Sequence, residues 1–229
     1  IGSPIALLIE NKDWQNWQDI MSTELKIKGS DLKAVTSPRP GHADLAGAVK
    51  YDTHDMRNIL ERSSARETAM RVALGAIAKR FLSEFGIKIG SYVIQIGKVQ
   101  SSKLKIKSSE KELLEAFRSA EISPVRCPDK ISSKKMVQLI DKAVKEGNSL
   151  GGIFEVFATG VPVGLGSHIQ WDKRLDGKLA QALMSIQAIK GVEIGMGFEM
   201  SRKSGSEVMD EIFYKSPKFY RKTNNAGGI

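Results

Sequence analysis

Apolar residues recur at helical spacing between residues 62 and 85 of this 229-residue chain. Steps of three, four and one place them on one face of a helix with 3.6 residues per turn. They are Ala65, Ala69, Val72, Ala73, Ala76, Ile77 and Phe81. We expect this face to be buried, with the alanines admitting a close neighbour and the larger side chains supplying most of the apolar area. Ser64, followed three residues later by Glu67, has the spacing of a capping box, which predicts that the helix begins there.

Four other stretches have the alternation or the β-branched apolar content that is typical of strands. They are residues 5–9, 87–99, 153–158 and 192–199. Residues 38–42 read Pro-Arg-Pro-Gly-His. Two prolines and a glycine predict a loop there, because they prevent both a helix and a strand ladder. A glycine-rich turn, Gly-Val-Pro-Val-Gly-Leu-Gly, is expected at 160–166.

Four further helices are predicted from start signals and periodicity. They cover residues 11–27, 109–120, 132–146 and 175–188. Helix followed by a glycine-punctuated strand recurs two or three times, but the copies share too little sequence to establish an internal duplication. The pattern favours the α+β class. Residues 28–61 show no clear periodicity, and the lysine- and serine-rich residues 101–108 are expected to form a solvated connection.

Composition narrows the class of partner. The net charge of +9 and the pI near 9.5 favour anions, without choosing between nucleic acid, a membrane surface and a phosphorylated metabolite. A single cysteine, Cys127, excludes an intrachain disulfide framework, fits a reducing cytoplasm and is read as a spare thiol in a loop.

No apolar run reaches the roughly 20 residues that span a bilayer, and no signal peptide opens the chain. The sequence contains no dinucleotide or NTPase glycine motif and no Cys/His cluster for zinc, so we expect no metal.

Cationic residues gather at the predicted start of the long helix. Arg62 and Arg66 flank Ser64, where free backbone amides and the helix dipole favour an anion. A capping box alone usually only caps, but two arginines beside it indicate a phosphate or carboxylate ligand. Arg39 and His42 in the upstream loop support this interpretation, and His42 is a candidate general acid or base because imidazole titrates near neutral pH.

Five motifs in this order resemble those of the chorismate synthase family. They are Arg-Pro-Gly-His-Ala-Asp at 39–44, Arg-Ser-Ser-Ala-Arg-Glu-Thr-Ala-Met-Arg at 62–71, the glycine turn at 160–166, Ala-Leu-Met-Ser-Ile-Gln-Ala-Ile-Lys-Gly-Val-Glu-Ile-Gly at 182–195, and Asn-Ala-Gly-Gly at 225–228. The resemblance implies a layered sandwich of β-sheets and helices, with residues 1–229 forming a single domain that is incomplete at both ends. It implies a shikimate-pathway lyase that converts 5-enolpyruvylshikimate 3-phosphate to chorismate and phosphate by 1,4-anti elimination.

The resemblance also implies partners. The cofactor is reduced FMN, and NADPH is involved only if the enzyme reduces its own flavin. We expect a small phosphorylated anionic substrate, a homotetramer in the cytoplasm, and neither nucleic acid nor membrane.

Site residues are carried over position by position. His42 matches a histidine near the flavin that is proposed to supply a proton. Arg39 and Arg66 match arginines that bind the substrate's anionic groups. The flavin-contacting residues are Arg62, Ser63, Ser64, Gln187 and Ala188.

The chain departs from the family in several ways. Glycines that precede Arg62 in many relatives are replaced here by Asn-Ile-Leu-Glu at 58–61, and Gln187 is Asn in some relatives. The family's Gly-Glu-Ser-His segment, with a second catalytic histidine, and a C-terminal part with an active-site aspartate have no counterpart in residues 1–229. We therefore expect an interior fragment that is inactive by itself.

Two alternatives stay open at this point. One is a basic nucleic-acid-binding module, for which the sequence offers Lys103, Lys105, Lys107, Lys134 and Lys135 but no interleaved aromatic residues. The other is a structural remnant that keeps the fold without the chemistry.

Overall fold

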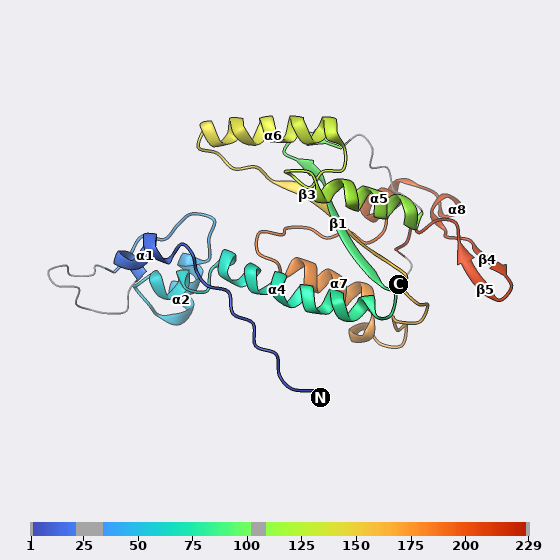
Figure 1. Cartoon of the computed structure of the whole chain (residues 1–229), viewed down its shortest axis with the longest axis horizontal. Coiled ribbons are helices and arrows are strands. Elements are labelled where there is room, and N and C mark those ends of the chain that lie inside the picture. Colours follow the sequence, from blue (N-terminus) through green and yellow to red (C-terminus); the bar gives the residue numbers. More distant parts are fainter. Residues whose placement is uncertain (1, 22–33, 102–108, 228–229) are drawn as a thin grey trace. The chain divides into compact units, whose positions relative to one another are not determined.

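The structure is a computed structural model, and it describes residues 2–21, 34–101 and 109–227 (Figure 1). The chain forms two compact units, Ile1–Ala78 and Lys79–Ile229.

The first unit begins with an extended segment and helix α1 (Trp14–Met21). The prediction of a buried strand at 5–9 is wrong: Ile5 is 71% exposed and Leu8 is 90% exposed. No strand pairs with this segment in the described part of the chain, so its backbone forms no ladder of hydrogen bonds with a neighbouring strand. Helix α1 begins within the predicted range 11–27, with the Trp17 indole N–H donating to Asp13 at 2.7 Å. Its predicted end lies outside the described residues.

Two short helices, α2 (Asp44–Tyr51) and α3 (Arg57–Leu60), occupy the region that showed no periodicity. They are too short to produce a readable repeat. They pack closely because Gly47 lacks a side chain: a Cβ there would lie 2.9 Å from the Ile59 side chain.

The long helix α4 spans Ser64–Ser83, so its predicted start is confirmed. The prediction that its alanine-rich face is buried is wrong, since none of its residues is buried and Val72 and Phe81 are 74% and 63% exposed. Exposed Leu74 lies off the predicted stripe, so apolar residues occupy more than one side of the helix. The apolar stripe read from the sequence therefore does not mark a buried face of α4.

The second unit is built on an antiparallel sheet with strand order β2-β1-β3. The strands are β1 (Lys88–Ile96), β2 (Val99–Gln100) and β3 (Gly152–Thr159). The strands predicted at 87–99 and 153–158 are confirmed. The first is divided by a turn at Gly97, whose φ of +52° an extended strand does not allow.

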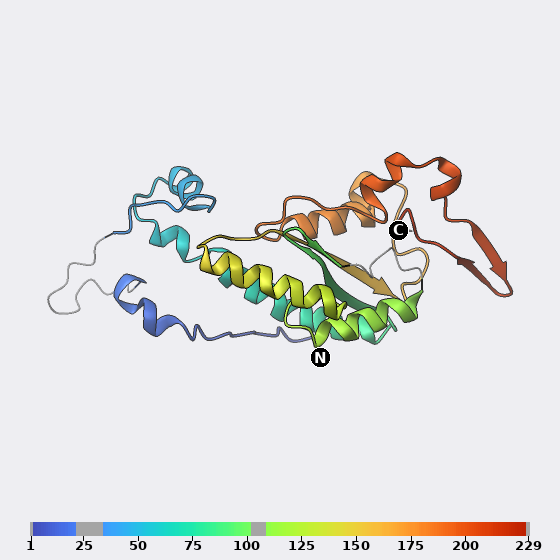
Figure 2. The same ribbon diagram turned by 90° about the horizontal axis from the view of Figure 1, so that it is seen from above.

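Helices α5 (Glu110–Glu121) and α6 (Lys130–Lys145) follow one another along the sheet (Figures 1 and 2). Ser109 caps α5 by accepting from the Glu112 N–H at 3.3 Å, as its spacing predicted. Asp129 caps α6, which begins two residues before the predicted 132.

Tyr92 and Phe157 of the sheet and Ala116 and Ala120 of α5 form the core. The Tyr92 and Phe157 rings lie 5.9 Å apart, and Gly90 makes room for Phe157. The fold is therefore α+β, as predicted, with a helix layer on a small sheet.

The C-terminal part contains short elements. In chain order they are η1 (Trp171–Lys173), α7 (Leu175–Met184), η2 (Gly197–Arg202), α8 (Gly205–Val208), β4 (Ile212–Lys215) and β5 (Lys218–Arg221). Helix α7 ends four residues before the predicted 188. The strand predicted at 192–199 is wrong, because Gly195 and Gly197 have φ values of +62° and +55° and turn the chain into η2.

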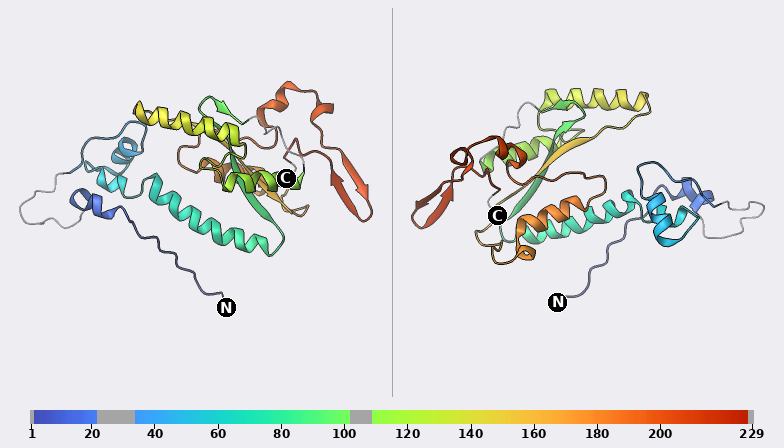
Figure 3. Two further views of the ribbon diagram at one scale, coloured as in Figure 1. Left: turned by 45° about the horizontal axis from the view of Figure 1, so that its top comes forward. Right: turned by 180° about the vertical axis from the view of Figure 1, so that it is seen from behind.

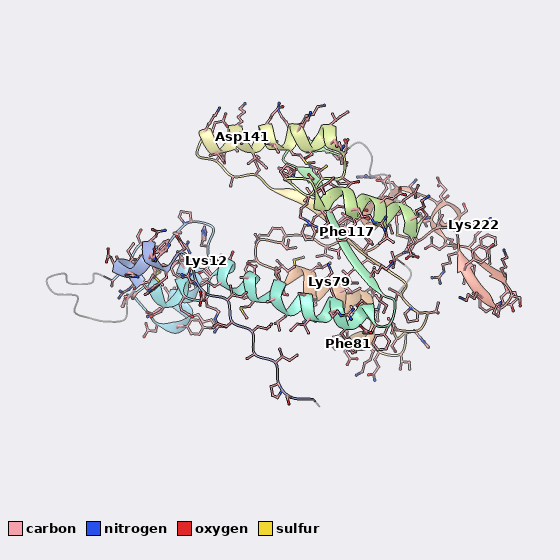
Figure 4. The ribbon with its side chains drawn as sticks, in the orientation of Figure 1. Lys12, Lys79, Phe81, Phe117, Asp141 and Lys222 are labelled. Carbon is pink, nitrogen blue, oxygen red and sulfur yellow. The ribbon has the colours of Figure 1, made fainter. Side chains whose placement is uncertain are left out.

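The β4–β5 hairpin, which the sequence analysis missed, projects from the second unit (Figure 3). Its aromatic rings pair across the strands, Phe213 with Tyr220 at 5.5 Å and Tyr214 with Phe219 at 5.0 Å. Lys222, labelled in Figure 4, lies with its Nζ 4.2 Å from the centroid of the Phe213 ring.

Two further predictions concern the single cysteine and the lysine- and serine-rich connection. Cys127 is in a loop, as predicted, but it is buried, with its Sγ 3.6 Å from the Asp129 carbonyl. Most of the lysine- and serine-rich connection lies outside the described residues. Within the described ranges, no helix is both long enough and apolar enough to cross a membrane.

Candidate functional site

The loop that holds His42 is organised by an ion pair. The Asp44 carboxylate accepts from the Arg39 backbone N–H at 2.9 Å, from its Nε at 2.9 Å and from its Nη2 at 3.1 Å. Asp44 is 1% exposed and begins helix α2, where a negative charge is favourable. Hydrogen bonds from the Arg39 side chain outweigh the effect of burial and lower the pKa of Asp44 to about 2. Both ends of the loop are therefore fixed by a charged carboxylate.

His42 is exposed within this loop, and its ring is oriented by the backbone. Nδ1 lies 2.9 Å from the Pro40 carbonyl oxygen. Since a carbonyl oxygen only accepts, this contact assigns the proton to Nδ1 and leaves Nε2 directed away from it. Nε2 is then the atom that can take or give a proton.

Four candidate residues lie in α4 near its start or directly before it. The Ser63 hydroxyl donates to the Ile59 carbonyl at 3.1 Å, and Ser64 is the first helical residue. Arg66 donates from Nη1 to the Leu60 carbonyl at 2.8 Å, whereas Arg62 is exposed. Glu67, the other half of the predicted capping box, forms an ion pair with Arg71.

The His42 loop and the start of α4 belong to the same compact unit. They are linked through the Gly47–Ile59 contact of α2 with α3, and Ile59 also supplies the carbonyl that Ser63 contacts. In the described part of the chain, no hydrogen bond or ion pair joins His42 or Arg39 directly to Ser63, Ser64 or Arg66. A shared pocket for these residues stays a prediction.

Gln187 and Ala188 lie in the second unit, in a turn that follows α7. Both are exposed. Ala188 has a φ of +68°, in the left-handed region that a residue with a Cβ adopts only at a cost. Backbone strain of this kind is concentrated at functional sites.

Ala188 and Ile189 line an open apolar groove of about 570 Å³. The groove runs between the end of α6 and the edges of β1 and β3, and its size falls within the range of ligand pockets. Gln95, Asn148 and Ser149 are its polar lining residues. Across the described residues, no group of three His, Cys, Asp or Glu side chains is arranged to hold a metal ion.

The sequence analysis gave no role to two carboxylates that organise these segments, Asp44 and Asp210. Asp210 accepts from the Asn225 N–H at 2.7 Å and from the Ala226 N–H at 3.0 Å. For Asp44 a signal was present, because an aspartate two residues after His42 and five after Arg39 lies at the start of a helix. For Asp210, 15 residues separate it from Asn225, and no local pattern connects the two.

Comparison with known proteins gives a consistent result. A family profile described as chorismate synthase matches residues 1–229. The chorismate synthase of Brevibacillus brevis is 56% identical over 230 residues, a match that covers 100% of this chain and 58% of that protein. The chorismate synthase of Aquifex aeolicus is 55% identical over 232 residues, with the same coverage.

A solved crystal structure of chorismate synthase superposes with a TM-score of 0.78 at 55% identity, covering 82% of this chain and 57% of that chain. The chain thus spans 58% of the length of these two curated relatives.

Proposed function

The chain belongs to the chorismate synthase family, and we propose on this premise that it serves the family's lyase reaction. In that reaction 5-enolpyruvylshikimate 3-phosphate loses phosphate by 1,4-anti elimination to give chorismate, in the shikimate pathway of aromatic amino acid biosynthesis. The observation that carries the proposal is the 56% identity to a curated chorismate synthase over the whole of this chain.

Arg39 and Arg66 are proposed to bind the substrate's phosphate and carboxylates. Each guanidinium is already oriented by one protein acceptor and keeps other donors for a ligand. Arg39 uses Nε and Nη2 on Asp44, which leaves Nη1, and Arg66 uses Nη1 on the Leu60 carbonyl, which leaves Nε and Nη2. Donors fixed before the substrate arrives need little reorganisation as charge develops on the departing phosphate.

His42 is proposed to hold or supply a proton at Nε2. The Pro40 carbonyl fixes the ring through Nδ1, and the Arg39–Asp44 pair fixes the loop, so the proton-transferring atom has a defined direction. General acid or base catalysis depends on such placement within hydrogen-bonding reach of the reacting group.

The residues present fit a flavin mononucleotide by the chemistry of their donors. The Arg62 guanidinium and the Ser64 hydroxyl suit a phosphate, and the start of α4 adds a favourable dipole. The Ser63 hydroxyl, whose proton goes to the Ile59 carbonyl, can accept from a ribityl hydroxyl. The Gln187 amide can both donate and accept, as the edge of a flavin ring requires. Reduced FMN, when bound, supplies the electron-rich ring that the elimination requires without net redox change.

The remaining features of the proposal follow the family. They are a homotetrameric state, a cytoplasmic location, and NADPH only where flavin reduction is intrinsic. No specific observation in the structure or among the relatives favours either alternative, the nucleic-acid-binding module or the structural remnant.

The proposal is tested by phosphate release from 5-enolpyruvylshikimate 3-phosphate under anaerobic conditions with reduced FMN. A protein of the relatives' full length that contains this chain should release one phosphate per chorismate formed. The 229-residue chain by itself should release none, because it spans only 58% of the length of the curated relatives. Absence of turnover in the longer protein, with FMN bound, would refute the lyase assignment.

A further inference from the structure

Gln187 and Ala188 lie on a connection, residues 185–196, that contains neither helix nor strand. At its start, α7 holds it: the Ser185 N–H donates to the Gln181 carbonyl at 2.9 Å. At its far end, the Met196 N–H donates to the Asn225 carbonyl at 2.7 Å. The position of that end therefore depends on Asn225.

Asn225 is itself held by the Asp210 carboxylate. One oxygen accepts from the Asn225 N–H at 2.7 Å and the other from the Ala226 N–H at 3.0 Å. Burial raises the pKa of Asp210, but hydrogen bonds from the Ala226 N–H, the Thr223 side chain and the Asn225 N–H outweigh burial and keep this pKa below its ordinary value. Asp210 is thus a charged acceptor at neutral pH.

Glycines let residues 194–196 and 225–227 approach so closely that neither segment can shift without a steric clash. A Cβ at Gly195 would lie 2.2 Å from the Asn225 carbonyl oxygen, and one at Gly227 would lie 2.6 Å from Cγ2 of Ile194. At Gly195 the two backbones are in direct contact, and at Gly227 the backbone packs against the Ile194 side chain. A displacement of the turn at 225–226 is therefore passed on to residues 194–196.

We infer that Asp210 is a positioning residue for the flavin contact: it holds the turn at 225–226, which fixes the far end of the connection that carries Gln187 and Ala188. The inference rests on the proposed function. Asp210 acts through Asn225 and Met196, and it is not assigned any contact with flavin or substrate.

The test uses a protein of the relatives' full length that contains this chain. Asp210→Asn replaces one acceptor with an NH₂ group that faces a backbone N–H. We expect FMN affinity, measured by quenching of flavin fluorescence, to fall about tenfold, the scale of one charge-assisted hydrogen bond. In the absence of FMN, amide exchange at Asn225, Ala226 and Met196 should accelerate. Glu211→Gln, an exposed carboxylate one residue away, should leave both measurements unchanged.

Gly195→Ala is the second variant, because its Cβ displaces the turn without altering the carboxylate. It should weaken FMN binding in the same direction as Asp210→Asn, so the inference stays testable if one variant fails to fold. If either folded variant shows faster amide exchange at 225–226 with wild-type FMN affinity, the role of Asp210 is merely structural and the inference is overturned. A wild-type protein that binds no FMN and releases no phosphate refutes the proposed function instead, and these two failures are distinguishable.

Discussion

The Asp44 carboxylate accepts three hydrogen bonds from Arg39, one from its backbone N–H and two from its guanidinium. The two residues are five positions apart, so this single pair closes the loop that presents His42. Asp44 is buried while Arg39 is about half exposed, so water screens the pair on one side only.

Asp44→Asn should lower the free energy of unfolding by about 1–3 kcal/mol, because the amide keeps one acceptor but places a donor against the guanidinium. Urea denaturation measures the change. Asp52→Asn is the matched control, since Asp52 is exposed at the end of α2 in a left-handed conformation that Asn tolerates. A loss of equal size in both variants would show that the ion pair contributes nothing specific.

The same pair predicts a pH dependence. The folded-state pKa of Asp44 is lowered to about 2 from an ordinary 3.8. The unfolded state therefore binds a proton first, so the stabilisation is complete above about pH 4 and is lost as the pH falls toward 2. Denaturation curves of wild-type protein and Asp44→Asn should accordingly converge over this acid range. Curves that stay parallel down to pH 2 would contradict the assignment.

His42→Ala should reduce turnover by roughly 10²–10⁴-fold, the range for loss of a positioned general acid or base. FMN affinity should change little, because the proposed role concerns proton transfer at Nε2 and not retention of the cofactor. Steady-state phosphate release and a flavin titration, both in a protein of the relatives' full length, separate the two effects. His54→Ala, the matched control, should retain activity. A wild-type rate for His42→Ala would remove His42 from the mechanism.

Two glycines give opposite predictions for the same substitution. Gly90→Ala would place a Cβ 2.4 Å from the Phe157 ring, and we expect a loss of about 1–3 kcal/mol through overpacking of the core. At Gly75, inside α4, a Cβ meets nothing within 4 Å. Gly75→Ala should therefore stabilise the protein by roughly 0.5–1 kcal/mol, because alanine loses less backbone entropy in a helix. Urea titrations of both variants check the sign, and equal effects would contradict the packing described around Phe157.

Local signals in the sequence predicted several elements correctly. The start of α4 at Ser64, the cap of α5 at Ser109 and the strands around 88–96 and 152–159 each depend on residues close together in the chain. Predictions that required knowledge of neighbours failed. The run at 5–9 is apolar enough for a strand but has no partner among the described residues, and the alanine-rich face of α4 is not buried.

The residues of the candidate site fall into two groups: those that motifs identify and those that the structure reveals. The sequence singled out Arg39, His42, Arg62, Ser63, Ser64, Arg66, Gln187 and Ala188 through motifs, and their roles stay predictions. What the sequence analysis missed were the supports: the Asp44 carboxylate, for which a local signal was present, and the Asp210 carboxylate, for which none was. Their partners are fixed by the path of the chain and by close backbone contacts.

By itself, the sequence determined the α+β class, the starts of α4 and α5, and the family, because these depend on short-range propensity and on ordered motifs. Only the tertiary structure decided which strands pair, and that Asp210 holds the turn at 225–226, whose Asn225 carbonyl accepts from the Met196 N–H. Hydrogen bonds and close packing between residues distant in sequence arise when the backbone brings them together, and no local pattern of side chains encodes that meeting.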